Sequence, residues 1–141
     1  MKISQLITGK TPLTISADAT VHELVTALAN HQIGALIVSN DGRIIEGIVS
    51  ERDVVRAMPS RFSQLPELHV RDLMTVDVVT AVPDTRIDDL MTIMTERRVR
   101  HIPIVDGDGS LISIVSIGDI VKSKINELDD ERRLLIEYIN Q

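Results

Sequence analysis

The chain contains no cysteine among its 141 residues. Without thiols it cannot form disulfides, thiolate nucleophiles or cysteine-ligated zinc and iron–sulfur sites. Thiol redox chemistry and cysteine-based catalysis are therefore excluded as functions.

Aromatic residues are almost as scarce, with one Phe, one Tyr and no Trp. Proteins that bind nucleic acid by stacking bases need aromatic side chains and a basic surface. This chain instead carries a net charge of −6, which disfavours association with a phosphate backbone. We therefore expect no nucleic-acid partner.

Long apolar runs are also missing. Residues 1–18 contain no uninterrupted apolar stretch of signal-peptide length, and no later stretch approaches the roughly 20 apolar residues that span a bilayer. We therefore expect a cytoplasmic protein without a membrane partner. The hydrophobic content of 43% is enough to fill one compact core, built from aliphatic side chains and Met.

An internal repeat with an offset of 66 residues runs through the chain. GIVSERDVV at 47–55 and SIVSIGDIV at 113–121 agree at five of nine positions, and such self-similarity indicates a duplicated structural unit. With a one-residue gap the match extends upstream to residues 3–8 and 70–75. These two stretches, the lead segments, precede the first and the second copy.

Within each copy the hydrophobic period changes from that of a helix to that of strands. Apolar residues recur on one face of the helical segments, strand-like runs flank Gly-containing turns, and a second helix opens at Ser50 or Ser116. Each copy therefore predicts the order β-α-β-β-α. The expected segments are extended chain at 13–15 and 79–81, helices at 20–31 and 86–97, and hairpin turns at 40–42 and 106–109.

The expected fold class is α/β (α+β), with two tandem repeats packed sheet to sheet as one pseudo-twofold module. One copy alone could bury only one face of its sheet, whereas two copies can bury both. We place the first repeat at 7–66 and the second at 70–126. The prolines and polar residues of 59–69 predict a linker, and residues 127–141 predict a C-terminal helical extension.

The best-matched segment of the two copies is V-S-x-x-D, which contains Ser50 and Asp53, or Ser116 and Asp119. One interpretation is helix capping, in which the hydroxyl and the carboxylate satisfy N–H groups at a helix start. The other is a ligand site, because a hydroxyl and free N–H groups can receive a phosphate and a carboxylate can accept both ribose hydroxyls. The residues alone leave both interpretations open.

The duplicated unit, the two I-V-S-x-x-D junctions and the strand V-R-H-I-P-I-V-D resemble a tandem pair of CBS (cystathionine β-synthase) domains, often called a Bateman module. The resemblance covers roughly residues 1–125. It implies a regulatory sensor without catalytic activity. It also implies an adenosine ligand as effector, such as AMP, ADP, ATP, S-adenosylmethionine or NAD(H), in two clefts between the repeats, with no required cofactor.

The resemblance also implies roles for individual residues. Ser50, Arg52, Asp53, Ser116 and Asp119 would contact phosphate and ribose. The basic phosphate contact of the family falls on Arg100 and His101, where the first copy has only Gly34 and Ala35. Adenine is expected against main-chain groups near Ile15 and Ala17, or near Ala81 and Pro83.

This asymmetry predicts two unequal clefts. We expect the stronger cleft to contain Arg100, His101, Ser116 and Asp119. The weaker cleft is expected to be built around Arg52 and Asp53.

No enzyme motif supports catalysis. The chain has no G-x-S-x-G elbow, no P-loop and no G-x-G-x-x-G after a strand, and its histidines lack the spacing of helix-face metal ligands. A nucleotide-processing enzyme with Asp53 or Asp119 as base stays a weaker alternative, and no metal site is predicted.

The segment after residue 119 predicts a long helix with Ile125, Leu128, Leu135 and Ile139 on one side. That side could pack on its own module or on a second copy. We expect a homodimer that signals ligand occupancy to a protein target. The alternative is a structural dimerisation module whose clefts stay empty.

Overall fold

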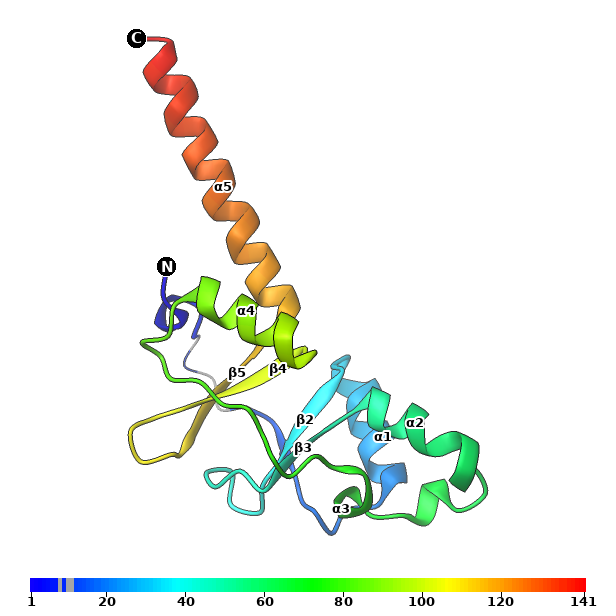
Figure 1. Cartoon of the computed structure of the whole chain (residues 1–141). Helices are drawn as coiled ribbons and strands as arrows, with labels where there is room; N and C mark the ends of the chain where they lie inside the picture. The colour runs from blue at the N-terminus through cyan, green and yellow to red at the C-terminus, as the bar shows by residue number, and fades with distance from the viewer. Residues whose placement is uncertain (8, 10–11) are drawn as a thin grey trace.

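The computed structural model describes residues 1–7, 9 and 12–141. The first repeat has the predicted β-α-β-β-α order, whereas in the second repeat the strand expected at 79–81 is reduced to a single parallel bridge between Ala81 and Ile104. The first repeat contains β1 (Thr14–Ile15), α1 (Val21–His31), β2 (Ala35–Val38), β3 (Gly47–Ser50) and α2 (Glu51–Arg61). The second contains α4 (Ile87–Arg97), β4 (His101–Val105), β5 (Leu111–Ser116) and α5 (Ile117–Ile139), as Figure 1 shows. Short helical turns lie at η1 (Ile3–Gln5), η2 (Leu65–Glu67) and α3 (Val70–Leu73).

Helices α1 and α4 begin and end at equivalent positions of the repeat. At the start of α1 the Thr20 hydroxyl accepts the N–H of Glu23 at 3.1 Å, which satisfies one free donor of the first turn. Both helices end on a residue in the left-handed conformation, Gln32 with φ 52° and Arg98 with φ 54°. These residues reverse the chain into β2 and β4, because a left-handed residue ends a helix sharply.

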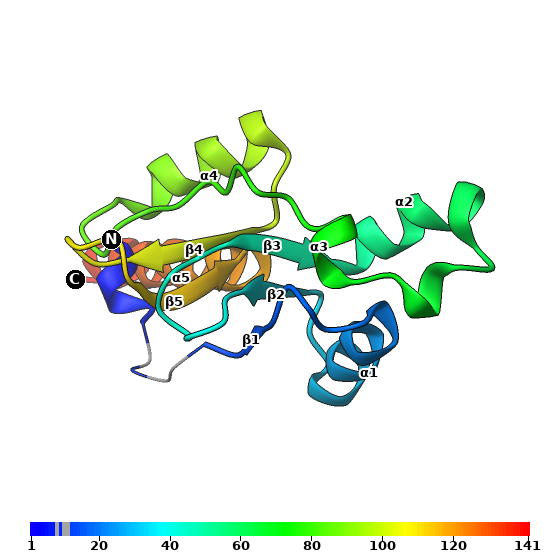
Figure 2. The ribbon, with the colours of Figure 1, turned by 90° about the horizontal axis from the view of Figure 1, so that it is seen from below.

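The two sheets lie next to each other in the middle of the module. Strand β1 pairs in parallel with β2, β2 pairs antiparallel with β3, and β4 pairs antiparallel with β5. Figures 1 and 2 both show the two hairpins adjacent, and Figure 2 shows α4 and α1 on opposite sides of them. All residues of β2 are buried: Leu36 and Val38 face the core of their own repeat, and Ala35 and Ile37 are buried on the other face. Burial on both faces agrees with the predicted sheet-to-sheet packing.

The lead segments are exchanged between the repeats. Ile3 is fully buried in the core of the second repeat, and its N–H donates to the Thr85 carbonyl at 2.9 Å. Val70 is fully buried in the core of the first repeat, and its N–H donates to the Ala19 carbonyl at 2.8 Å. Each core is therefore completed by the lead segment that precedes the other copy.

The linker predicted at 59–69 is wrong in two places. Helix α2 continues to Arg61, and Pro59 is accommodated in its last turn, where one missing N–H removes a single hydrogen bond. Leu65 is 7% exposed and belongs to the core of the first repeat. Two apolar residues, Phe62 and Leu65, lie between the prolines without a helical or strand period, so the sequence could not predict which of them is buried.

Helix α5 leaves the body of the module after its first two turns (Figure 1). Ile120 and Ser123 are buried, whereas Leu128 and Leu135 are 53% and 62% exposed. Packing of the whole helix on its own module is therefore wrong for its outer half. None of the helices in the described part of the chain combines the length and the hydrophobicity that a bilayer crossing requires.

Because Ile3 lies in the core of the second repeat, its substitution should lower the stability of the protein although it is far from that repeat in sequence. Ile3→Ala should lower the free energy of unfolding by about 2–4 kcal/mol, because it leaves a cavity in the second core. Val76→Ala is the control, since Val76 is 69% exposed, and its effect should stay within about 0.5 kcal/mol. Urea unfolding followed by circular dichroism measures both. Equal effects of the two substitutions would show that Ile3 does not complete that core.

Candidate functional site

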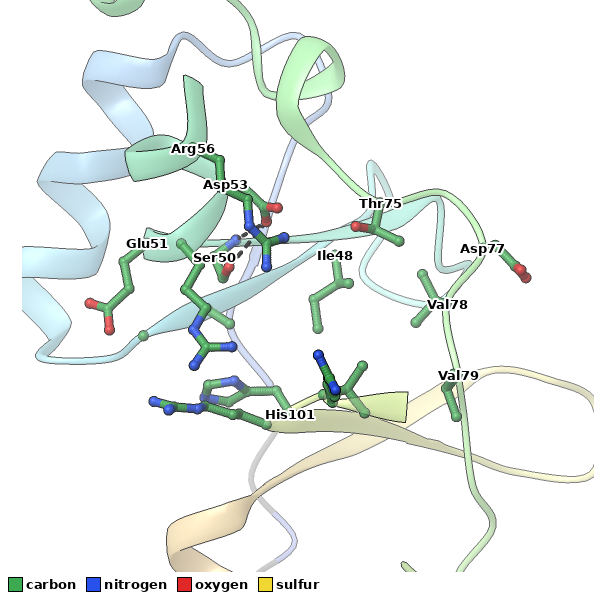
Figure 3. A pocket seen from close by; sticks show the side chains of 16 residues that line it. Ile48, Ser50, Glu51, Asp53, Arg56, Thr75, Asp77, Val78, Val79 and His101 are labelled. Atoms are coloured by element: carbon green, nitrogen blue, oxygen red, sulfur yellow. Dashed lines mark hydrogen bonds between the residues drawn. The ribbon is translucent and has the colours of Figure 1, made fainter. Parts of the chain in front are cut away.

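A cavity of about 170 Å³ lies between the two repeats and is lined by both (Figure 3). Its walls come from the entry to β2, the β3–α2 junction, the chain at 75–79 and the chain at 98–101. Ligand pockets in proteins usually measure about 300–1,000 Å³. A nucleotide would therefore extend from the mouth of this cavity.

One wall is held in place by backbone pairing between the repeats. The N–H of Ile48 donates to the Thr75 carbonyl at 3.0 Å, and the N–H of Thr75 donates to the Ile48 carbonyl at 2.8 Å. Gly47 permits this close approach, because a Cβ at that position would lie 2.8 Å from the Thr75 carbonyl oxygen. The segment that leads into the second repeat is thus fixed against β3 of the first.

The two junction carboxylates both cap their helices. Oδ2 of Asp53 accepts the N–H of Ser50 at 2.8 Å and its hydroxyl at 3.1 Å. Oδ2 of Asp119 accepts the N–H of Ser116 at 3.0 Å, and the Ser116 hydroxyl accepts the N–H of Asp119 at 3.2 Å. The capping interpretation is therefore confirmed. In the described part of the chain Oδ1 of each carboxylate receives no hydrogen bond, so capping leaves one oxygen for a ligand.

Four arginines line the cavity, Arg52 and Arg56 from the first repeat and Arg98 and Arg100 from the second. Across residues 1–7, 9 and 12–141, none of these guanidinium groups lies within 4.0 Å of a carboxylate oxygen. Figure 3 shows Arg56 reaching from α2 into the cavity and Asp77 pointing away from it. The arginines outnumber the three carboxylates of the lining, so its excess positive charge favours an anion.

His101 lies at the base of the cavity, half-buried beside Gly34. Burial lowers the pKa of His101, the carboxylates of Asp119 and Glu51 partly offset this lowering, and the Arg100 charge adds to it. The imidazole is therefore expected to be neutral at pH 7 in the empty cavity. A phosphate beside it would favour protonation and add a further positive charge.

The cavity contains all the basic residues predicted from the sequence, but they come from both of the predicted clefts. Ser50, Arg52 and Asp53 line it together with Arg100 and His101. The remaining candidates lie outside its lining: Ile15, Ala17, Ala81, Pro83, Ser116 and Asp119.

This cavity therefore does not contain Ser116 and Asp119, although the Asp119 carboxylate lies near enough to raise the pKa of His101. His101 and Ser116 are cross-strand neighbours in β4 and β5. The junction that shares the cavity with His101, however, belongs to the other copy. Thr8, which the repeat aligns with Thr75, lies outside the described residues.

Sequence patterns predicted neither the wall at Thr75, Asp77, Val78 and Val79 nor the place of Arg56 in the lining. The extended segment has neither helical nor strand periodicity, and its role follows only from the pairing with Ile48. The one available signal was the alignment of the lead segments, which showed that both copies have such a stretch.

Known proteins resemble this chain over both repeats. The CBS domain family matches residues 3–60 and 70–126. The CBS domain-containing protein CBSX3, mitochondrial, of Arabidopsis thaliana is 34% identical over 128 residues, which are 88% of this chain and 62% of the plant protein. A crystal structure of a CBS-domain containing protein from Agrobacterium tumefaciens has 33% identity and a TM-score of 0.83, and the match covers 88% of this chain and 99% of that one.

The crystal structure of CBSX2 in complex with AMP has the same fold, with a TM-score of 0.76 at 23% identity. The match covers 89% of this chain and 96% of that one. The Arabidopsis mitochondrial protein is longer than this chain, which spans 62% of its length.

The surroundings of His101 predict how its pKa responds to substitution. In the parent protein the NMR titration midpoint of the imidazole should lie below the ordinary value near 6.5. Asp119→Asn should lower it further, because the carboxylate raises the pKa, and Arg100→Gln should raise it, because the guanidinium lowers the pKa. A parent midpoint at or above 6.5, or shifts of the opposite sign in the two variants, would contradict this description of the site.

Proposed function

Because the chain belongs to the CBS-domain family and carries two such domains in tandem, we propose that it is a regulatory module that binds an adenosine phosphate between its repeats and performs no catalysis. The observation that carries the proposal is the convergence of four unpaired arginines from both repeats, within the described residues, on one cavity beside the Asp53 carboxylate.

The lining suggests an orientation for the ligand. Asp53 has one carboxylate oxygen left by capping, and a carboxylate can accept both hydroxyls of a ribose. The phosphates would face the arginines and His101, where charge-assisted hydrogen bonds are strongest. Adenine would lie against the apolar wall formed by Ile48, Val78 and Val79. The base would therefore contact residues that precede Ala81 and Pro83, the positions expected from the sequence.

The charge of the cavity favours phosphate-bearing effectors over other adenosine compounds. Four guanidinium groups outnumber the three carboxylates of the lining, Glu51, Asp53 and Asp77, and each added phosphate brings further negative charge. S-adenosylmethionine carries a sulfonium cation and no phosphate, so it should bind more weakly. The complex of CBSX2 with AMP supports a nucleotide in this family.

The cleft at Ser116 and Asp119 is the proposed weaker site. Its counterparts of Arg52, Arg100 and His101 are Gly118, Gly34 and Ala35, none of which carries a charge. Among the five basic residues of the cavity, only Arg56 has a basic counterpart in the other copy, Lys122. We therefore assign the dominant occupancy to the cavity at Asp53.

Ligand occupancy would act on the relative position of the repeats. A ligand held by residues of both copies stabilises the arrangement that it binds best, and this differential affinity is the signal. Glu51 and Gly34 line the cavity and also a groove between α1 and α2 on the surface. A change at Glu51 can therefore reach a surface that a protein target or a second copy would contact.

Calorimetric titration of the parent protein should give affinities in the order ATP, ADP, AMP and S-adenosylmethionine, from tightest to weakest. Asp53→Ala should weaken the tighter phase by on the order of a hundredfold, since hydrogen bonds to a charged group contribute about 1.5–3 kcal/mol each. Asp119→Ala is a matched control, because both aspartates cap a helix through the same contact to a Ser N–H. It should leave the tighter phase within about threefold of the parent.

If both variants lost affinity equally, the loss would be due to the missing helix cap, and the assignment of the ligand to this cavity would be contradicted. No binding heat with any of the four compounds would instead favour a structural module with empty clefts. Turnover of ATP that disappears in Asp53→Ala would favour the enzyme alternative.

A further inference from the structure

The outer half of α5 is an exposed helix outside the matched family. The CBS domain match ends at residue 126, whereas α5 continues to Ile139 and projects from the body (Figure 1). From Val121 to Ile139 the helix runs for about 27 Å at 1.5 Å per residue. An exposed element of this length with apolar side chains is expected to have a partner.

Five of the exposed apolar residues form a stripe with the period of a coiled coil. Spacings of four and three residues alternate along the stripe, apart from one interruption at Arg132, as in a helix that packs on another helix of similar pattern. The residues of this seam are Val121, Ile125, Leu128, Leu135 and Ile139, which are 46%, 54%, 53%, 62% and 77% exposed.

Charged residues flank the seam in pairs of opposite sign. On one side Lys122 precedes Asp129 by seven residues, and on the other Lys124 precedes Glu131 by seven residues. Lys124 already contacts Asp88 at 3.1 Å and Glu127 at 3.7 Å. Within the described residues neither Lys122 nor Asp129 lies within 4.0 Å of an opposite charge. The flank at Lys122 and Asp129 is therefore available to a partner.

We propose that the seam of α5 pairs with the same helix of a second copy in antiparallel orientation, around an axis near residues 126–127. Flanking charges set the orientation of paired helices. An antiparallel pair places Lys122 beside Asp129 of the second copy and Asp129 beside its Lys122. The other flank places Lys124 beside Glu131, and Ile125 packs on Leu128 of the second copy.

A parallel pair fits the sequence less well. It would stack Arg132 on its own counterpart within the seam, which places two like charges in contact. It would also leave Lys122 beside the apolar Ile117. The antiparallel pair avoids both contacts and is therefore the orientation that the charges favour.

The end of the helix supports the same orientation. Leu134 and Tyr138 lie off the seam and are 62% and 77% exposed, so the last turns are apolar on more than one side. In an antiparallel pair Leu134 falls level with Asp119 of the second copy and Tyr138 level with the end of its β5, where the body of the second copy can cover them. In a parallel pair they would project away from both bodies.

Charge reversal tests the pairing in ligand-free protein, so its outcome is independent of nucleotide binding. Lys122→Glu and Asp129→Lys should each weaken the dimer by about tenfold in sedimentation equilibrium, because each replaces two symmetric ion pairs with two repulsions. The double variant should return to within about threefold of the parent. Glu137→Lys is the control, because it makes the same charge change as Asp129→Lys on the opposite face of the helix and should have no effect.

Three results would overturn the proposal. The parent chain could sediment as a monomer at about 100 µM, far above the dissociation constant expected of a specific dimer. The single variants could leave the dimer unchanged. The double variant could be as weak as Asp129→Lys alone, which a parallel pair requires. Circular dichroism of each variant checks that these exposed substitutions leave the fold intact.

Discussion

The exchange of lead segments holds the two repeats together and positions the cavity between them. Ile3 and Val70 are both fully buried, each in the core of the repeat that it does not precede. Neither repeat can therefore complete its core without chain that belongs to the other. Because the second lead segment ends at Thr75, the same exchange fixes Thr75 against Ile48 and brings the chain at 75–79 to the cavity. The cavity exists only while the two repeats are packed together.

This origin gives the cavity its electrostatic character. The chain as a whole has a net charge of −6, yet the cavity gathers Arg52 and Arg56 from one repeat and Arg98 and Arg100 from the other. An anion bound between them would attract arginines of both repeats at once. In the proposed binding mode, ligand binding would therefore be coupled to repeat packing through these side chains. Such coupling is what a regulatory module needs, because an effector acts only by stabilising one arrangement over another.

Much of the fold was predictable because it depends on local patterns. The duplication, the helices and the hairpins follow from the periodicity within each copy, and Ser50, Asp53, Arg100 and His101 were recognisable as candidates. The sequence could not show which of these residues share a cavity. A repeat alignment shows which positions of the two copies are equivalent, whereas the cavity combines non-equivalent positions from both copies. The burial of Leu65 among polar residues and the wall at Val78 left no periodic signal. The exposed seam of α5 was visible in the sequence, but only the structure showed that the module does not cover it.

The proposed binding mode requires one ligand to contact both repeats in the cavity at Asp53. Amide chemical shifts recorded during an AMP titration of isotope-labelled protein test it most directly. This binding mode predicts that the amides of Ser50, Thr75 and His101 shift together and yield a single dissociation constant. It would be contradicted if the amides of Ser116 and Asp119 shifted with His101 while those of Ser50 and Thr75 stayed in place.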